Sequence, residues 1–225
     1  MQKLGQHFLK DKSVLEKIIT AIDFGINENI IEVGPGHGEL TNLIVRELKK
    51  NNGKLVMIEK DSKLFLELQE NFNNSNHIIL EGDALKIVPK LVDSKEFKNK
   101  KYKIVGNIPY YITGYLLRVI GESKSKPQIC VFTIQNEVAD RINAKPPHMN
   151  LLAASVQIWA DTKIISRVPR GAFSPPPKVQ SAVIKLTTKT MGIPKSDLLN
   201  YYKFLHTIFK QPRKTILNNL VDGLG

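Results

Sequence analysis

The sequence predicts an α/β protein with a mostly parallel, seven-stranded sheet, an antiparallel hairpin at one sheet edge, and a small helical C-terminal domain. Three observations predict this fold. Short apolar runs, typical of buried parallel strands, alternate with amphipathic helical patterns from residue 30 onward. The first run ends in a turn with three glycines, and the composition changes near Gly192. Alternating strands and helices form parallel sheets with right-handed crossovers, so one layered domain is expected before the change.

Composition restricts the class of protein. The 225 residues are enough for one large α/β domain and a smaller appendage, and 42% hydrophobic with 24% charged residues is typical of soluble globular proteins. No apolar run approaches the ~20 residues of a membrane span, and the amino terminus lacks the apolar core of a signal peptide. A single cysteine, Cys130, excludes an internal disulfide, and no Cys/His spacing indicates zinc. We therefore expect a cytoplasmic protein without a structural metal or a membrane partner.

The net charge of +12 favours a polyanionic partner, most simply nucleic acid. The alternative is a lysine-rich organism whose proteins are all basic. One stretch, residues 95–103, is dense in lysines and is either a positive edge for RNA or a solvated loop. Its lysines are Lys95, Lys98, Lys100, Lys101 and Lys103.

The first helix is predicted after residues 5–9, with Asp11 or Ser13 as its N-cap, and it runs to about residue 24. The segment before it is either a frayed terminus or a flap over a ligand. Further strands are expected at residues 30–33, 54–58, 77–80, 101–105 and 128–134, and further helices at 40–50, 63–72, 113–122, 135–143 and 151–160.

Two β-rich runs, residues 162–168 and 181–188, flank a proline-rich connection and predict the antiparallel edge hairpin. Apolar residues at helical spacing from Leu198 to Phe209 predict a helix, and residues 213–220 a second one. We accordingly divide the chain into a domain at residues 1–191 and a small helical domain at residues 192–225.

Polar acceptors stand where three consecutive strands of the predicted sheet end: Glu59, Asp83 and Asn107. Carboxyl ends of parallel strands line one crevice, here together with the glycine turn at residues 34–38. A carboxylate after the second strand can accept hydrogen bonds from both ribose hydroxyls, and Asp83 can accept one from the exocyclic amine of adenine. For each carboxylate alone the alternative is a helix N-cap. Jointly the three favour an adenosine site.

The glycine turn itself indicates which adenosine compound binds. Its spacing is G-x-G-x-G, with Glu32 before it and Glu39 after it. Two carboxylates would repel a pyrophosphate and would suit an ammonium group. S-adenosylmethionine, which carries an α-ammonium and no phosphate, is therefore the better match than a dinucleotide.

The turn Asn107-Ile108-Pro109-Tyr110 is the most specific chemical signal. Methyl transfer to an exocyclic amine requires the nitrogen lone pair to be aligned, and acceptors on the Asn107 side chain and the Ile108 carbonyl can do this. Pro109 stiffens the turn, and Tyr110 offers a face on which an extruded base stacks. Phe173 is a second candidate platform, near Lys178 as a phosphate contact; the alternative is that Phe173 belongs to the core.

These motifs together resemble the KsgA-type ribosomal RNA adenine dimethyltransferases. The matching stretches cover nearly the whole chain: residues 5–9, 32–41, 59–61, 82–85, 107–110, 135–141, 173–183 and 213–220. The resemblance implies a Rossmann-like S-adenosylmethionine-dependent methyltransferase fold. It also implies N6,N6-dimethylation of two adjacent adenosines near the 3′ end of 16S ribosomal RNA, with the immature 30S subunit as partner.

The resemblance further assigns roles to residues by position. It implies cofactor contacts at Gln6, His7, Leu9, Gly34, Pro35, Gly36, Glu59, Lys60, Asp83, Ala84 and Asn107. The target adenine would be held by Asn107, Ile108, Pro109, Tyr110 and Phe173. No metal ligand is implied.

Three alternatives to a KsgA-type enzyme are considered: two related families and one protein of another functional class. Erm-type methyltransferases modify large-subunit RNA and share the strand-end residues, whereas residues 135–141 and 213–220 look like the KsgA type. Mitochondrial transcription factors share the fold, but nothing here looks like a transit peptide. A non-catalytic RNA-binding or assembly factor is the rival from another class, and the intact turn at residues 107–110 argues against it. Family members usually continue beyond the last match, so the C-terminal domain is expected to be curtailed; we expect a monomer.

Overall fold

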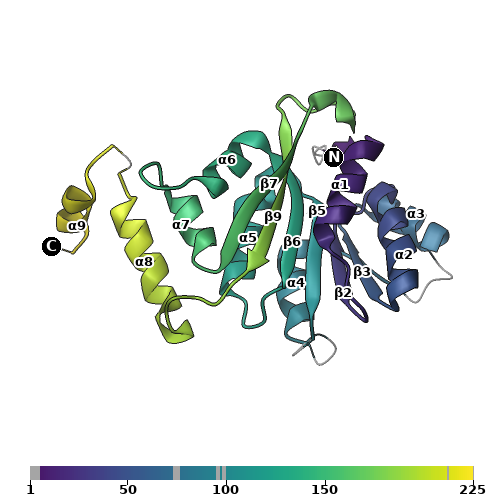
Figure 1. The fold of residues 1–225 in the computed structure, drawn as a ribbon, viewed down its shortest axis with the longest axis horizontal. Helices are drawn as coiled ribbons and strands as arrows, with labels where there is room; N and C mark the ends of the chain where they lie inside the picture. The colour runs from purple at the N-terminus through teal and green to yellow at the C-terminus, as the bar shows by residue number, and fades with distance from the viewer. Residues whose placement is uncertain (1–5, 73–76, 95–96, 98–99, 212, 225) are drawn as a thin grey trace.

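A mixed sheet forms the centre of the molecule in the computed structural model, which describes residues 6–72, 77–94, 97, 100–211 and 213–224 (Figure 1). The strand order is β4-β3-β2-β5-β6-β9-β7. The strands are β2 (Asn29–Val33), β3 (Lys54–Glu59), β4 (Ile78–Glu81), β5 (Tyr102–Asn107), β6 (Ile129–Gln135), β7 (Ala160–Val168) and β9 (Ser181–Thr188). The first five in this order are parallel, and β9 is antiparallel to both β6 and β7. The predicted fold class and the edge hairpin are confirmed.

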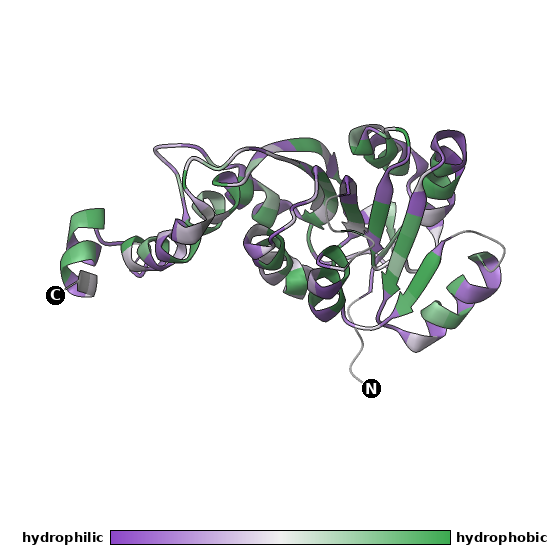
Figure 2. Ribbon diagram, turned by 90° about the horizontal axis from the view of Figure 1, so that it is seen from below, coloured by the Kyte–Doolittle hydropathy of each residue, from purple (hydrophilic) through white to green (hydrophobic). Residues whose placement is uncertain are grey.

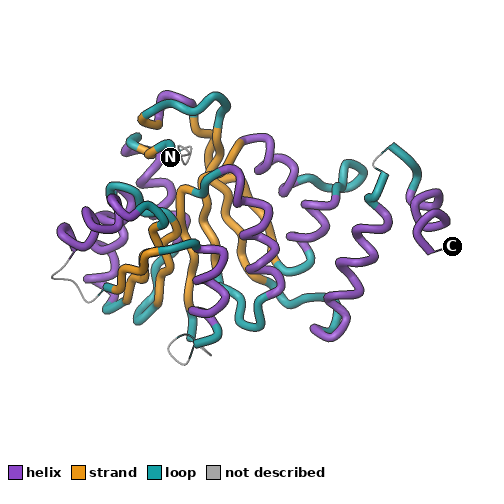
Figure 3. The backbone as a smooth tube through the Cα atoms, turned by 180° about the vertical axis from the view of Figure 1, so that it is seen from behind, coloured by secondary structure: helices purple, strands orange, loops and turns teal. Residues whose placement is uncertain are grey.

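Helices cover both faces of the sheet because neighbouring strand residues point to opposite faces. One layer consists of α1 (Lys12–Ile22), α2 (Glu39–Asn51) and α3 (Ser62–Phe72). The other consists of α4 (Ala84–Val92), α5 (Thr113–Glu122), α6 (Asn136–Asn143) and α7 (Leu151–Gln157). Each layer buries its own apolar cluster against the sheet. Hydrophobic residues run along the strands in Figure 2, and helices of the second layer cross the strands in Figure 3.

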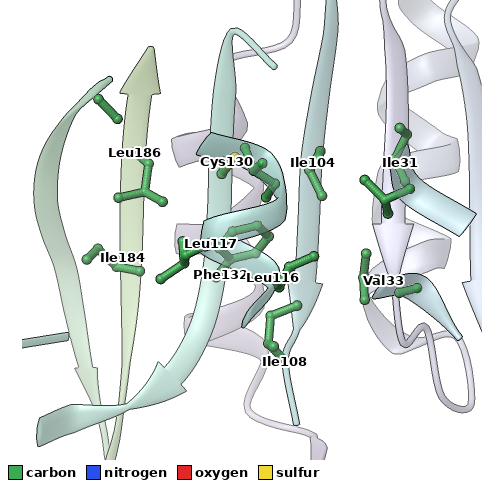
Figure 4. Close-up of a cluster of buried hydrophobic side chains, with 14 of the residues drawn as sticks. Ile31, Val33, Ile104, Ile108, Leu116, Leu117, Cys130, Phe132, Ile184 and Leu186 are labelled. Atoms are coloured by element: carbon green, nitrogen blue, oxygen red, sulfur yellow. The ribbon is translucent and has the colours of Figure 1, made fainter. Parts of the chain in front are cut away.

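The apolar cluster under the α4–α7 layer anchors the carboxyl end of β5, where the cavity begins. Leu116 and Leu117 of α5 pack among Ile104 and Phe132 (Figure 4). Ile108, directly after β5, is 1% exposed and lies in the same cluster. The chain therefore leaves β5 with its first turn residue anchored in the core.

Helix α4 was missed from the sequence because Pro89 lies inside it, and proline normally disrupts a helix interior. Elsewhere the predicted elements hold, with shifted ends. Asp11 caps α1 by accepting hydrogen bonds from the backbone N–H groups of Ser13 and Val14, at 2.8 and 3.1 Å. Helix α7 ends at Gln157 rather than at residue 160 because β7 begins there.

The segment before α1 is part of the folded structure and not a frayed end. Strand β1 (Phe8–Leu9) pairs antiparallel with β8 (Phe173–Ser174), so that Leu9 lies opposite Phe173. The backbone N–H of Lys10 also donates to the carbonyl of Ala172, at 2.8 Å. The part of the N-terminal segment that the structure describes is therefore fastened as a flap to a loop more than half the chain away.

The predicted lysine edge fails at Lys103 and stays a prediction at Lys100 and Lys101. Lys103 is 3% exposed, and its Nζ lies 2.7 Å from Glu28 Oε2, so it is a buried ion-pair partner and that part of the prediction was wrong. Lys103 is a residue of β5 whose side chain is buried. A run of lysines in the sequence does not show which of them point inward, so the prediction included it. Lys100 and Lys101 are exposed at the amino end of β5, and Lys95 and Lys98 lie outside the described residues.

The C-terminal part forms α8 (Leu198–Ile208) and α9 (Ile216–Leu224), which lie beyond α7 at one end of the molecule (Figure 1). Helix α8 packs on α7, where the Tyr201 hydroxyl donates to the Ala154 carbonyl at 3.1 Å. The boundary near Gly192 remains a prediction. Within the described ranges, no helix has the length and apolarity needed to cross a membrane.

Candidate functional site

The carboxyl ends of β2, β3, β4 and β5 and the N-terminal flap enclose one open cavity with about 840 Å³ of empty space, part of it open to solvent. The sequence-predicted residues that line it are Gln6, His7, Gly34, Gly36, Glu59, Lys60, Asp83, Ala84, Asn107, Ile108, Pro109 and Tyr110. Three others do not line it. Leu9 and Pro35 border a smaller neighbouring cavity beside Glu32, and Phe173 lies elsewhere.

The glycine turn approaches the cavity with left-handed backbone. Gly34 and Gly36 have φ of +67° and +61°, a region that residues with a Cβ rarely adopt. A Cβ on Gly36 would also lie 2.8 Å from Cδ1 of Phe8, whose ring covers the turn from the flap. The open backbone here is what a ligand lying against a strand–helix turn requires.

Glu59 is held as an acceptor at the end of β3. It is 5% exposed, and its carboxylate accepts from three backbone N–H groups: Gly36 at 3.2 Å, Lys60 at 2.8 Å and Asp61 at 2.9 Å. Burial raises the pKa of this carboxyl, and the three hydrogen bonds oppose that rise. The remaining lone pairs can accept from the hydroxyls of a ribose.

Asp83 is a helix N-cap, the alternative that its position allowed, and it also lines the cavity. Its Oδ1 accepts from the backbone N–H of Leu85 at 3.0 Å and so caps α4. Its Oδ2 lies 3.2 Å from Nζ of Lys60, and this hydrogen bond raises the pKa of the lysine. A ligand amine at Asp83 would therefore compete with Lys60 for one oxygen.

The two carboxylates flanking the glycine turn each interact with a neighbouring side chain. Glu32 is 1% exposed, and burial raises its pKa to about 8, so its carboxyl is mostly protonated at neutral pH. The Thr41 hydroxyl donates to it at 2.8 Å. Glu39 forms an ion pair with Lys10 of the flap.

The turn after β5 presents acceptors to the cavity. Asn107 Nδ2 donates to the His7 carbonyl at 2.6 Å, which leaves its Oδ1 without a donor among the described residues. The Ile108 N–H bonds to the Thr133 carbonyl at 3.0 Å, while the Ile108 carbonyl accepts no hydrogen bond within the described ranges. The Tyr110 hydroxyl is 2.7 Å from Ser181 Oγ, and the Tyr110 ring is stacked 6.2 Å from the His7 ring.

Phe173 lies in the core rather than in the cavity wall. It is 4% exposed, and it packs in the apolar cluster of the α1–α3 layer. Its strand nevertheless borders the site, because His7 Nδ1 is 2.9 Å from the Pro175 carbonyl of the same loop. A stacking role for Phe173 stays a prediction, and it requires this loop to move.

The cavity contains residues that sequence reasoning missed. Tyr111, 64% exposed, lines the cavity beside Tyr110. Asp61 is not a lining residue, but it accepts a hydrogen bond from the lining residue Gln6 at 3.4 Å. Each immediately neighbours a residue that was predicted, which was the available signal. The apolar walls Val33, Ile58 and Leu64 had none, since they read as ordinary core positions.

Known proteins resemble this chain over its length. Residues 1–224 match the family model described as ribosomal RNA adenine dimethylase. A ribosomal RNA small subunit methyltransferase A of Dehalococcoides mccartyi is 41% identical over 227 residues, covering 99% of this chain and 75% of that protein.

Two solved structures agree with the fold. A dimethyladenosine transferase from Plasmodium falciparum superposes with a TM-score of 0.77 at 27% identity, covering 95% of this chain and 74% of that one. The 23S rRNA methyltransferase ErmE superposes with a TM-score of 0.75 at 22% identity, covering 96% and 84%, and shows the fold alone. The chain belongs to the ribosomal RNA adenine dimethylase family.

Proposed function

We propose that this protein is an S-adenosylmethionine-dependent ribosomal RNA adenine dimethyltransferase, which methylates N6 of two adjacent adenosines near the 3′ end of 16S ribosomal RNA. Family membership and the name of the Dehalococcoides relative support the reaction and the small-subunit substrate. The observation that carries the proposal is the pair of unengaged acceptors, Asn107 Oδ1 and the Ile108 carbonyl, at the mouth of the adenosine-type cavity. The enzyme would act in the cytoplasm, as a monomer, during small-subunit biogenesis.

The residues at the strand ends fit the proposed cofactor. Glu59 is placed to accept from the ribose hydroxyls, and Asp83 to accept from the adenine amine after displacing Lys60. Gly34 and Gly36 line the cavity with the left-handed backbone that the turn requires. When bound, S-adenosylmethionine supplies an electrophilic methyl group on a sulfonium that is a good leaving group, so no strong protein base is needed.

The residues after β5 fit the substrate. The target base must leave its stack to enter the site, and Tyr110, fixed by Ser181, gives it a ring to stack on. Asn107 Oδ1 and the Ile108 carbonyl would then accept hydrogen bonds from the two N6 hydrogens. These hydrogen bonds would hold the amine so that its nitrogen lone pair points toward the methyl group. Alignment and electrostatic stabilisation thus supply the rate enhancement.

An Erm-type enzyme would carry out the same chemistry on a different substrate, the large-subunit RNA. Fold similarity does not distinguish the two types, because the TM-scores of 0.77 and 0.75 are nearly equal. The test is incubation with labelled S-adenosylmethionine and unmethylated small or large ribosomal subunits, followed by mapping of the label. Dimethyladenosine in the small-subunit RNA is expected. Label in the large subunit would favour the Erm type, and no label in either would favour a non-catalytic RNA-binding factor.

A further inference from the structure

A groove that shares no lining residue with the cavity lies between α1 and the β7–β9 hairpin, with about 1200 Å³ of empty space, part of it open to solvent. Its basic lining consists of Lys17 on α1, Lys163 on β7 and Lys185 on β9. Beyond Val183, which α1 buries, the same face of β9 continues into this groove at Lys185 and Thr187. The antiparallel end of the sheet is thus left open on one face, with lysines along it.

Two of these lysines oppose one another directly. Lys163 and Lys185 are Cα partners in the β7–β9 register. Like charges at directly opposite positions of an antiparallel pair are destabilising, because their Cβ atoms are only ~4.5–5.5 Å apart. Neither lysine forms an ion pair with any described residue. The pair therefore weakens the hairpin unless an anion lies between the two ammonium groups.

The two acidic residues of the groove form ion pairs with cations that do not line it. Glu16 lies 3.7 Å from Arg46, and Asp161 lies 2.9 Å from Lys189. Lys17, the third cation, contacts the neutral Ser166 hydroxyl of β7 at 3.3 Å. Together with the hydrogen bond from Ser13, the charge of Lys17 also helps to lower the pKa of Asp11, the N-cap of its own helix. Three positive charges on three elements thus line the groove, and among the described residues none of them forms an ion pair.

We propose that this groove binds a backbone phosphate of the RNA substrate, held between Lys163 and Lys185 with Lys17 beside it. The proposal rests on the proposed function for the identity of the polyanion. Helix α1 begins three residues after β1, the strand of the flap that borders the cavity, and Lys17 follows one and a half turns later. An RNA strand that leaves the cavity along α1 reaches the groove. This contact would add to any made by Lys100 and Lys101, which are exposed before β5.

The test compares RNA binding and stability in matched variants. The double variant Lys163→Thr/Lys185→Thr keeps strand-forming residues at both positions. Lys101→Thr is the control, because it removes an exposed lysine that precedes β5 and does not line the groove. Binding of a labelled RNA from the 3′ end of small-subunit ribosomal RNA is measured against salt concentration. The double variant should bind more weakly, and its log K–log salt slope should be shallower by ~0.7–0.9, the value for one lost phosphate contact.

A second readout separates binding from folding. Because the like-charge pair is removed, the Tm of the double variant should equal or exceed that of the wild type, while its affinity for S-adenosylmethionine stays unchanged. A wild-type salt slope in the double variant, or an equal loss in Lys101→Thr, overturns the groove proposal while the methyltransferase assignment stands. Wild-type protein that neither binds nor methylates this RNA overturns both.

Discussion

The side-chain amide of Asn107 donates to the backbone carbonyl of His7 at 2.6 Å, across 100 residues of sequence. This hydrogen bond joins the end of β5 to the N-terminal flap, which β8 in turn holds through the Phe8–Leu9 strand. It also fixes which end of the amide faces the cavity: Nδ2 is engaged, so Oδ1 is the free acceptor. The flap therefore orients the residue on which methyl transfer is proposed to depend.

Asn107→Ala should suppress both methyl transfers by more than ~100-fold, as expected when a preorganised electrostatic contact is lost. The measurement is mass spectrometry of nucleosides from RNA incubated with the enzyme. Asn150→Ala is a matched control, because Asn150 also bonds to backbone groups but lies outside the cavity. Activity of Asn107→Ala near that of the control would remove Asn107 from the reaction.

Glu59→Ala should weaken S-adenosylmethionine binding, because each charge-assisted hydrogen bond to a ribose hydroxyl contributes ~1.5–3 kcal/mol. Isothermal calorimetry measures the affinity. The substitution also leaves the N–H groups of Gly36, Lys60 and Asp61 without their acceptor, so thermal unfolding is recorded alongside. Glu67→Ala, an exposed carboxylate, is the control. Unchanged affinity in a folded Glu59→Ala protein would place Glu59 outside the site.

Phe173→Ala should retain some first transfer and accumulate N6-methyladenosine. After the first transfer only one N6 hydrogen remains, so the second depends more on stacking and less on paired hydrogen bonds. Because Phe173 is 4% exposed, truncation to alanine should also cost ~3–5 kcal/mol of stability. Phe173→Leu keeps most of the packing and loses the aromatic face. A wild-type ratio of mono- to dimethyl product in both variants would assign Phe173 to the core.

Glu32→Gln should change how stability depends on pH. The pKa of Glu32 rises on folding from its ordinary 4.5 to about 8, so its stabilising contribution is complete below 4.5 and is lost as pH rises through 8. Across this window the wild type should lose up to ~1.4 kcal/mol per pH unit relative to the variant. The amide oxygen of the substituted side chain would still accept from the Thr41 hydroxyl. Parallel unfolding free energies of the two proteins from pH 5 to 8 would contradict the buried, protonated carboxyl.

The alternation of strands and helices and the polar residues at strand ends were readable from the sequence, because their signals are local. A parallel sheet places every strand's carboxyl end on one edge, so Glu59, Asp83 and Asn107 had to meet once the strands were recognised. Helix α4 was missed for a local reason as well, because Pro89 breaks the helical pattern.

Only the tertiary structure decided how deeply each of these side chains is buried, what shifts its pKa and which partner it bonds to. Burial raises the pKa of Glu32, and Lys103 is buried beside its ion-pair partner Glu28. Lys163 and Lys185 become neighbours through the β7–β9 register, and Asn107 is oriented by His7. Burial, ionisation and hydrogen-bond direction depend on partners distant in sequence, whereas periodicity and turn chemistry depend on neighbours along the chain. The sequence by itself therefore determined most of the polar residues that gather at the site. Packing determined their burial and orientation, and it kept Phe173 out of the cavity wall.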